Sequence, residues 1–446
     1  MKILKTLSLK EQLVYIMISV LSLTIFVYYL SLNNKVSYHD EVGYFNFAKD
    51  IQNLGLFEVA NGLRTYLYSL IISIFLVVSS SENVFISKIL MSIFQYGVYL
   101  CTIFFLAVKS IESFKVKDQK KAFLYITGFG LLNPYLIQST TLFLTDILAT
   151  CFSVLAITIV QFCDCTKFRY KFITFILIYS AIMIRPSSLI FLLIMLMLLT
   201  YKIMKYSEGK TKQVFVGYAV AAMISTFVFL PQLYMNVTKF NNFTPLIHEN
   251  LYDSQSKWAV EMLKYGTVVI PDEQPQLYWT NPIQTEKDIG IYELIYKDFF
   301  AFIFVYIAHI FGVLDWGYID TYINNFYPIS RLVGSVFLYV TWILIFSGIF
   351  KVIRKKEINF RFMGLLISAI CYTLFIATTA IESRFGYPMF FLLLPFIGWF
   401  STESRLSKRS LFGIISLVIV MFLISFVLDL QTGRINWFEF LFKTEI

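Results

Sequence analysis

Two adjacent carboxylates, Asp40 and Glu41, stand just beyond the first apolar run of the chain, residues 11–32. A carboxylate at a membrane edge can accept the proton of an attacking hydroxyl, and its neighbour can orient a substrate or hold a cation. A structural role is the alternative, because acidic side chains also stabilise the first turn of a helix, and the residues from Val42 onwards read as a surface helix. His39 could add a substrate contact, but the sequence offers no HExxH motif and no second histidine nearby for a metal.

A third acid, Asp146, follows the hydroxyl-rich stretch 139–145 and begins another apolar run. It could work together with Asp40 on a substrate. In isolation, however, Thr145 or Asp146 would more simply cap the helix that starts there.

Two arginines occupy comparable positions at the edges of apolar runs. Arg384 lies in Glu382-Ser383-Arg384-Phe385-Gly386-Tyr387-Pro388, and Arg185 precedes Pro186. A guanidinium at this depth suits two-pronged recognition of a phosphate at the level of the lipid headgroups. The alternatives are an ion pair with Glu382, or an anchor whose charged end reaches towards water. We expect His309, on an apolar face, to be a buried structural histidine.

Composition defines the class of protein that positions these residues. Of the 446 residues, 58% are hydrophobic and only 15% are charged, against roughly 25% charged in a soluble domain. The net charge of +9 comes from short basic clusters between apolar runs, which is typical of cytoplasmic loops and not of a nucleic-acid surface. The sequence therefore predicts an all-α polytopic membrane protein, whose run 11–32 is an uncleaved signal anchor.

Placing all basic clusters inside requires the apolar runs 63–79 and 299–314 to stay on the outer side, and the run 172–200 to be a hairpin. We expect the hairpin to break at Arg185-Pro186, because proline interrupts a helix and arginine is costly at the bilayer centre. About eleven spans result, with the N-terminus inside: 11–32, 84–108, 122–138, 143–163, 172–185, 187–204, 213–234, 332–350, 362–380, 386–401 and 411–428.

This topology divides the chain into three parts. Residues 1–234 form an N-terminal transmembrane module whose first outer loop, 33–83, carries the paired acids. Residues 235–331 form an exoplasmic loop with surface helices, and residues 332–446 form a C-terminal transmembrane module. Seven candidate residues then emerge on the same outer face: His39, Asp40, Glu41, Asp146, Arg185, Glu382 and Arg384. Tyr387, in the same element as Arg384, is a further candidate for substrate binding.

Together these features resemble the GT-C superfamily of glycosyltransferases, which use polyprenyl-phosphate sugars and include protein O-mannosyltransferases and aminoarabinose transferases. The resemblance covers most of the chain. It rests on a signal anchor, the Asp40-Glu41 pair followed by a surface helix, an acid (Asp146) opening the fourth span, and an Arg-aromatic-x-x-Pro element at Arg384. It implies a GT-C-like fold with outer-face juxtamembrane helices.

The resemblance also implies a reaction. Asp40 would be the general base, Asp146 would contact acceptor or base, and Arg384 would hold the donor phosphate. We therefore expect an inverting transfer of a sugar from a polyprenyl-phosphate donor to a glycan, lipid or protein acceptor on the outer face, in a bacterial plasma membrane. No cofactor is certain, and a divalent cation is left open.

Two other functions remain open. A lipid-linked oligosaccharide polymerase or ligase would also use arginines on the outer face, although such enzymes carry their key residues in a late large loop. A transporter or lipid flippase would place ionisable residues near the middle of its spans and often shows internal repeats. This sequence has few such residues and no visible repeat, so transport is the weaker alternative.

Overall fold

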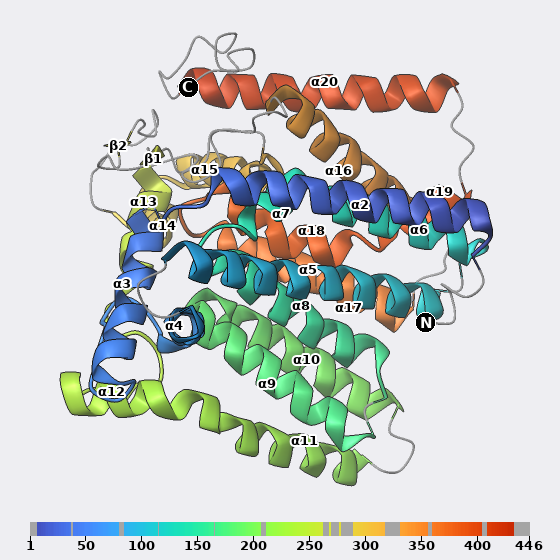
Figure 1. The fold of residues 1–446 in the computed structure, drawn as a ribbon. Helices are drawn as coiled ribbons and strands as arrows, with labels where there is room; N and C mark the ends of the chain where they lie inside the picture. Colours follow the sequence, from blue (N-terminus) through green and yellow to red (C-terminus); the bar gives the residue numbers. More distant parts are fainter. Residues whose placement is uncertain are drawn as a thin grey trace. The chain divides into compact units, whose positions relative to one another are not determined.

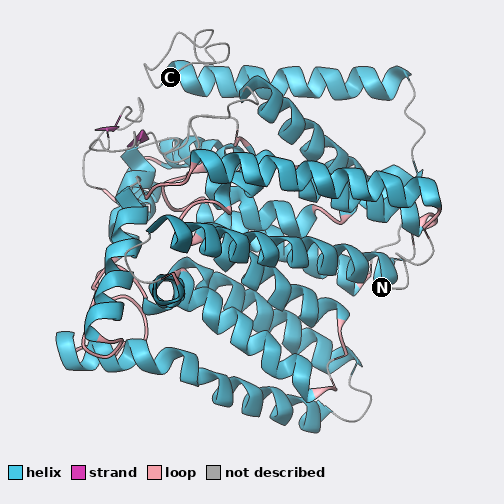
Figure 2. Cartoon of the chain, in the orientation of Figure 1, coloured by secondary structure: helices cyan, strands magenta, loops and turns pink. Residues whose placement is uncertain are grey.

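The structure is a computed structural model that describes residues 7–36, 39–79, 84–114, 116–164, 166–206, 211–261, 267–268, 276–277, 289–316, 331–355, 359–403 and 408–431. Most of these residues are helical (Figure 2). Among them, the strands are limited to β1 (Thr267–Val268) and β2 (Gln276–Leu277), which pair antiparallel. The predicted all-α fold class is confirmed. Much of the predicted exoplasmic loop 235–331, and the side chain of His39, lie outside the described part.

The chain divides into two compact units. The first comprises Met1–Lys115, Leu136–Glu249 and Ile358–Ala369, and the second comprises Val116–Tyr135, Asn250–Glu357 and Ile370–Ile446. The three parts predicted from the sequence follow chain order, whereas each of these units is assembled from separate stretches. The division into the three predicted parts stays a prediction.

The first unit contains most of the N-terminal helices. Its elements are α2 (Leu9–Leu32), α3 (His39–Leu54), α4 (Tyr66–Val78), α5 (Val84–Phe114), α8 (Asp146–Phe162), α9 (Phe168–Ile184), η1 (Pro186–Ser188), α10 (Leu189–Tyr206), α11 (Thr211–Ser225), η2 (Thr226–Phe229) and α12 (Leu230–Phe240). The short helix α7 (Pro134–Ser139) and the longer α17 (Phe360–Ile376) each have residues in both units.

The second unit contains the remaining elements. They are α6 (Gln119–Leu131), α13 (Leu251–Glu261), α14 (Ile291–Lys297), α15 (Phe299–Leu314), α16 (Arg331–Arg354), η3 (Ser383–Gly386), α18 (Tyr387–Leu393), α19 (Phe396–Glu403) and α20 (Lys408–Gln431), with β1 and β2. Helix α19 packs against α16 and α6, while α13, α14 and α15 pack on one another around Val260, Ile291 and Val305.

Each of the eleven predicted spans coincides with a helix or with adjoining helices. Within the described residues, five helices are long and apolar enough to cross a membrane, and a sixth candidate is the bent pair Ser383–Leu393 and Phe396–Thr402. Helices α8, α9 and α17 have 17 residues each, or about 25 Å at the usual rise per residue, against a hydrocarbon core of about 30 Å. Eleven membrane crossings therefore remain a prediction. For six of them, counting the bent pair as one, the structure has helices that are long and apolar enough.

The predicted break at Arg185-Pro186 is confirmed. Helix α9 ends at Ile184, Arg185 has an extended backbone (φ −144°, ψ 107°), and a single 3-10 turn at Pro186 leads into α10. Proline has no N–H to continue the helix, and it disfavours the helical conformation in the residue before it. Arg185 is thereby presented at the tip of a helical hairpin.

Helices α3 and α4 run crosswise to the long helices of their unit. Figure 1 shows α3 running across the left-hand ends of α5 and α9 to α11, while α4 is viewed along its axis. Asp40 and Glu41 occupy the first turn of α3, where the partial positive charge of the helix N-terminus favours acidic side chains. The surface helix predicted after the acidic pair is present.

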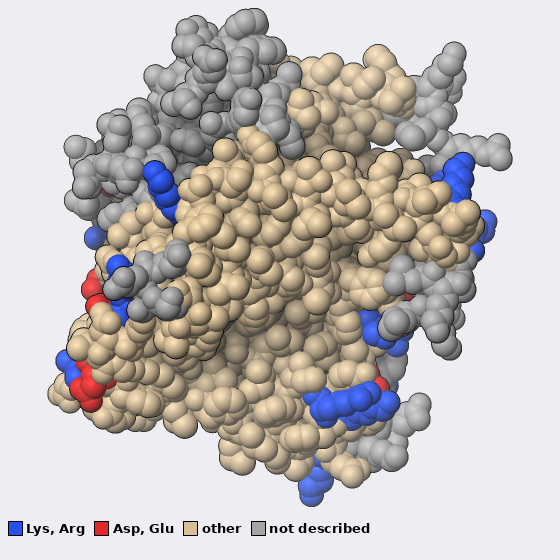
Figure 3. All heavy atoms as spheres, viewed as in Figure 1, with Lys and Arg blue, Asp and Glu red and all other residues tan. Residues whose placement is uncertain are grey.

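The surface of the first unit shows a broad apolar zone. Over α2, α5 and α11, the face in Figure 3 is almost free of charge, and the charged side chains gather at the helix ends. On α2, Leu13, Ile16 and Met17 are 58%, 55% and 63% exposed. Such exposure of large apolar side chains is expected where a helix faces lipid.

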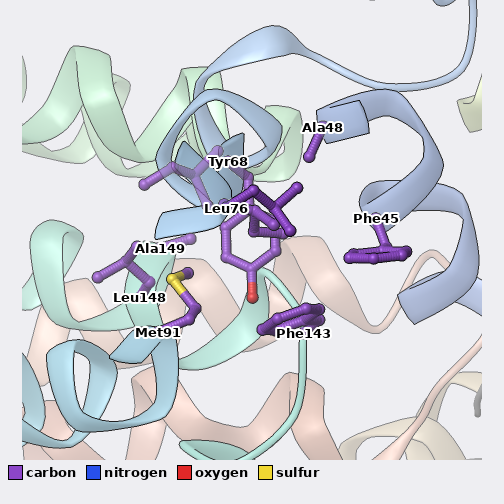
Figure 4. Packing of buried hydrophobic residues seen from close by; sticks show 10 residues of the cluster. Phe45, Ala48, Tyr68, Leu76, Met91, Phe143, Leu148 and Ala149 are labelled. Carbon is purple, nitrogen blue, oxygen red and sulfur yellow. The ribbon is translucent and has the colours of Figure 1, made fainter. Parts of the chain in front are cut away.

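The core of the first unit joins the crosswise helices to the long ones. Tyr68 and Leu76 of α4 lie among Phe45 of α3, Met91 of α5 and Phe143 of the segment before α8 (Figure 4). Tyr68 is fully buried and donates a hydrogen bond to Gln95 of α5 at 3.2 Å. This packing fixes α3, which carries the paired acids, against the start of α8.

Candidate active site

The Asp40 carboxylate lies at the edge of the first unit, with a basic partner from the loop before α4. The distance from Arg64 Nη2 to Asp40 Oδ1 is 3.3 Å, and the two side chains are 17% and 34% exposed. Asp40 is therefore the one predicted catalytic carboxylate that is substantially open to solvent, since Glu41 and Asp146 are 0% and 2% exposed.

Arg64 is held over the start of α3 by its surroundings. The Asn61 side chain accepts hydrogen bonds from the backbone N–H groups of Leu63 and Arg64, at 3.0 and 2.9 Å, which shapes the turn before α4. The guanidinium then passes over Gly43 and stands 5.0 Å from the centre of the Tyr44 ring. Gly43 leaves room for this approach.

Replacing Gly43 with alanine is expected to separate activity from stability. A methyl group there would come 2.4 Å from Arg64 Nη2, so the guanidinium must move away. Alanine is favoured over glycine inside a helix by about 0.5–1 kcal/mol, so the fold should not weaken. We expect turnover to fall about 10- to 100-fold through misplacement of the Asp40 pair, with an unchanged or higher melting temperature. A fall in the melting temperature together with the fall in turnover would contradict this expectation.

Glu41, next to Asp40, is fully buried and forms hydrogen bonds with two other segments of the unit. Its Oε1 accepts hydrogen bonds from Lys88 Nζ of α5 and from the Phe143 backbone N–H, both at 2.7 Å. Lys88, itself 1% exposed, also donates to the backbone carbonyl of Lys35. Glu41 therefore connects α3 to α5 and to the segment before α8.

Asp146 begins α8, as the sequence predicts, and pairs with Arg185 at the tip of the α9–α10 hairpin. Thr145 precedes it at the N-cap position but makes no side-chain capping hydrogen bond there. Arg185 also donates from Nε to Ser187 Oγ at 3.0 Å. Thr145 therefore does not cap α8 through its side chain, and Asp146 forms the ion pair with Arg185.

The Tyr44 hydroxyl is influenced by charges from both ion pairs. Burial raises the pKa of its hydroxyl, and the negative charge of Asp40 raises the pKa further. The positive charges of Arg64 and Arg185 oppose this rise, as does a hydrogen bond with Thr145. The Asp40–Arg64 and Asp146–Arg185 pairs are thus within electrostatic reach of one hydroxyl, which stays neutral at physiological pH.

The other predicted substrate-binding residues belong to the second unit. Glu382 binds Arg384 with two hydrogen bonds, from Nε to Oε2 at 2.6 Å and from Nη2 to Oε1 at 3.1 Å. The sequence allowed this ion pair as the alternative to phosphate binding by Arg384. Tyr387 is fully buried, edge-on to Trp316 at 5.0 Å between ring centres.

His309 has the structural role expected for it. It is fully buried in α15, and the distance from its Nδ1 to the Ala377 backbone oxygen is 2.8 Å.

Sequence reasoning missed Arg64 and Lys88 as partners of the acids, and the influence of both ion pairs on Tyr44. A signal existed for Lys88, because a lone lysine in the apolar run 84–108 calls for a buried partner. For Arg64, the clue was Gly43, a glycine inside a helix two residues after Glu41. Neither clue says which residue is the partner.

The donor set does not fit a divalent cation. Each of the three carboxylates faces a basic side chain, namely Arg64, Lys88 or Arg185. A cation at these oxygens would have to displace a positive charge that already balances the carboxylate. The described residues also contain no group of three or more His, Cys, Asp or Glu side chains arranged for a metal.

No protein-family profile and no curated protein matches the chain. Among solved structures, it is similar to the oligosaccharyltransferase of Archaeoglobus fulgidus in complex with Zn and sulfate, with a TM-score of 0.51, 13% identity, and coverage of 94% of this chain and 53% of that one. Two further structures of that protein, one tethered to an acceptor peptide containing the NVT sequon and one in the apo form, give TM-scores of 0.47 and 0.45 at 12% identity.

The oligosaccharyltransferase is a GT-C fold enzyme. The similarity to its complex with Zn and sulfate, with a TM-score above 0.5, establishes the fold of this chain but not its activity. The chain is a polytopic helical membrane protein with a GT-C fold. It spans about half the length of the solved protein that it resembles.

Proposed function

We propose that the chain is a membrane glycosyltransferase that moves a sugar from a polyprenyl-phosphate donor to an acceptor by a single inverting displacement. The observation that carries the proposal is the contrast among the three acids. Asp40 is 34% exposed and paired at 3.3 Å, whereas Glu41 and Asp146 are enclosed in ion pairs that position their elements. A general base must reach the proton that it removes, and Asp40 alone of the three meets this requirement.

In the proposed reaction, the acceptor oxygen attacks the anomeric carbon while Asp40 takes the proton of the acceptor hydroxyl. The bond between the anomeric carbon and the phosphate oxygen breaks, and its electron pair leaves with the lipid phosphate. Arg64 holds the Asp40 carboxylate in place over the first turn of α3. Glu41 and Asp146 act as positioning residues: Glu41 fixes α3 to α5, and Asp146 fixes the start of α8 to the hairpin tip.

Arg384 is proposed to bind the donor phosphate, with Arg185 as a second contact. Two-pronged hydrogen bonding between Arg384 and Glu382 fixes the guanidinium plane, and Arg384 is 12% exposed. A guanidinium held in this way can stabilise negative charge that develops on the leaving phosphate. Binding of phosphate would have to compete with Glu382, whose side chain is 6% exposed.

The membrane side follows from the charge pattern. With the basic clusters in the cytoplasm, Asp40 and Arg384 both lie on the outer face, where nucleotide sugars are scarce and a lipid-borne donor is available. The proposed location is a bacterial plasma membrane, and the acceptor is a glycan, a lipid or a protein.

The test is a donor panel for the purified protein in liposomes. Undecaprenyl-phosphate monosaccharides, an undecaprenyl-diphosphate oligosaccharide and UDP-sugars are supplied in turn, each with a membrane extract as acceptor. We expect transfer from the monophosphate donors with inversion at the anomeric carbon. Transfer from the diphosphate oligosaccharide alone would favour the oligosaccharide polymerase or ligase, and retention of configuration would contradict the single displacement.

A further inference from the structure

A group of exposed hydroxyls in the second unit is not used by the proposed reaction. Tyr252 of α13 donates a hydrogen bond to the hydroxyl of Tyr292 of α14 at 3.0 Å, and its oxygen lies 3.2 Å from Thr378 Oγ1. The two tyrosine side chains are 39% and 51% exposed, with ring centres 6.5 Å apart and planes inclined by 32°. Two aromatic faces and three hydroxyls thus share one small area of surface.

The group is ordered by its contacts with the rest of the unit. Burial raises the pKa of Tyr252 to about 12, so its hydroxyl keeps its proton at neutral pH and remains a donor. Thr378 also donates to the Phe375 backbone oxygen at 2.7 Å, and the Ala380 N–H donates to the Gln255 oxygen at 3.1 Å. These bonds tie α13 to residues 378–380, a few residues before Glu382 and Arg384.

The surroundings distinguish this surface from one that faces lipid. Helix α13 carries the exposed ion pair Asp253–Lys257, with an N–O distance of 3.3 Å and side chains 61% and 37% exposed. By contrast, the exposed side chains at the start of α15, Phe299 and Phe300, are 55% and 85% exposed and purely apolar. The tyrosine pair therefore lies on helices, α13 and α14, whose exposed surface also carries charged side chains.

We propose that Tyr252, Tyr292 and Thr378 form a carbohydrate-binding subsite. The apolar C–H face of a sugar ring packs on aromatic rings, while its hydroxyls exchange hydrogen bonds with side-chain hydroxyls that both donate and accept. The assignment rests on the proposed function, because the sugar would belong to a substrate of the transferase. Two sources share this chemistry: the sugar of the donor and a glycan acceptor.

Binding is tested without turnover. Saturation-transfer NMR is recorded on the purified full chain with trisaccharides of glucose, mannose and N-acetylglucosamine as probes. At least one probe should bind the wild-type chain, and the double variant Tyr252→Phe with Tyr292→Phe should weaken binding by roughly 3- to 10-fold for each hydrogen bond that is lost. Tyr296→Phe is the matched control, because Tyr296 is 89% exposed on the same helix as Tyr292 and outside the group.

The results separate the possibilities. No binding by wild type, or equal binding by the double variant, overturns the subsite. A nitroxide label at position 252 that is accessible to oxygen but not to a water-soluble nickel chelate would also overturn it, in favour of an aromatic anchor at the membrane interface. A higher KM of the double variant for the acceptor assigns the sugar to the acceptor, and a higher KM for the donor assigns it to the donor. Trisaccharide binding without any transferase activity would contradict the proposed function but support the carbohydrate-binding subsite.

Discussion

Asp40→Asn is expected to lower the rate of sugar transfer by about 10²–10⁴-fold, the usual contribution of a general base. Asparagine has nearly the same shape and can still accept a hydrogen bond from Arg64, but its side-chain amide cannot take up the acceptor proton. The measurement is the initial rate with purified protein in liposomes and a donor that the wild type uses. Donor KM should change much less than kcat, because the base acts on the acceptor in the transition state.

The matched control is Asp50→Asn, since Asp50 is an exposed acid on the same helix, ten positions beyond Asp40. It should transfer at the wild-type rate. Both variants should melt close to the wild-type temperature. If Asp40→Asn transferred sugar at the normal rate, Asp40 would not be the base. If Asp50→Asn were also slow, the loss of any negative charge on α3 would explain the effect, and the assignment of Asp40 as the base would lose its support.

Lys88→Met is expected to destabilise the fold by about 3–5 kcal/mol, because removing one partner of a buried ion pair leaves a buried charge without compensation. Glu41 would keep its carboxylate at 0% exposure with the Phe143 N–H as a remaining partner. The measurement is the denaturation midpoint in detergent, together with the melting temperature.

Two further variants test the cause of that loss. Glu41→Gln combined with Lys88→Met removes both charges while the amide oxygen can still accept from Phe143, so much of the stability should return. Lys109→Met breaks an exposed pair instead, with side chains 30% and 48% exposed, and should cost about 0–1 kcal/mol. Equal effects of Lys88→Met and Lys109→Met would show that the buried pair has no special role.

Local features of the fold were predictable because their causes are local. The break at Arg185 follows from the proline after it. The start of α3 follows from Asp40 and Glu41, acids that favour the first turn of a helix. The all-α class follows from apolar runs long enough to be helices in lipid.

The partners of the acids were not predictable, because they depend on contacts between distant parts of the chain. Glu41 and Lys88 are 47 positions apart, and Asp146 and Arg185 are 39 apart. Charge pattern places these residues near one face but does not say which acid is enclosed and which is open. The contrast between Glu41 and Asp40, and the full burial of Tyr387, depend on packing alone.

The central claim is that Asp40 and Arg384 both lie on the outer face of the membrane. It is tested most directly by labelling single cysteines at positions 40 and 384, and at the predicted cytoplasmic position 117, in a cysteine-free chain in intact cells with a membrane-impermeant maleimide. The account predicts labelling at 40 and 384 from outside, with 117 labelled only after the cells are opened. Labelling of 40 and 384 from opposite sides of the membrane would contradict it.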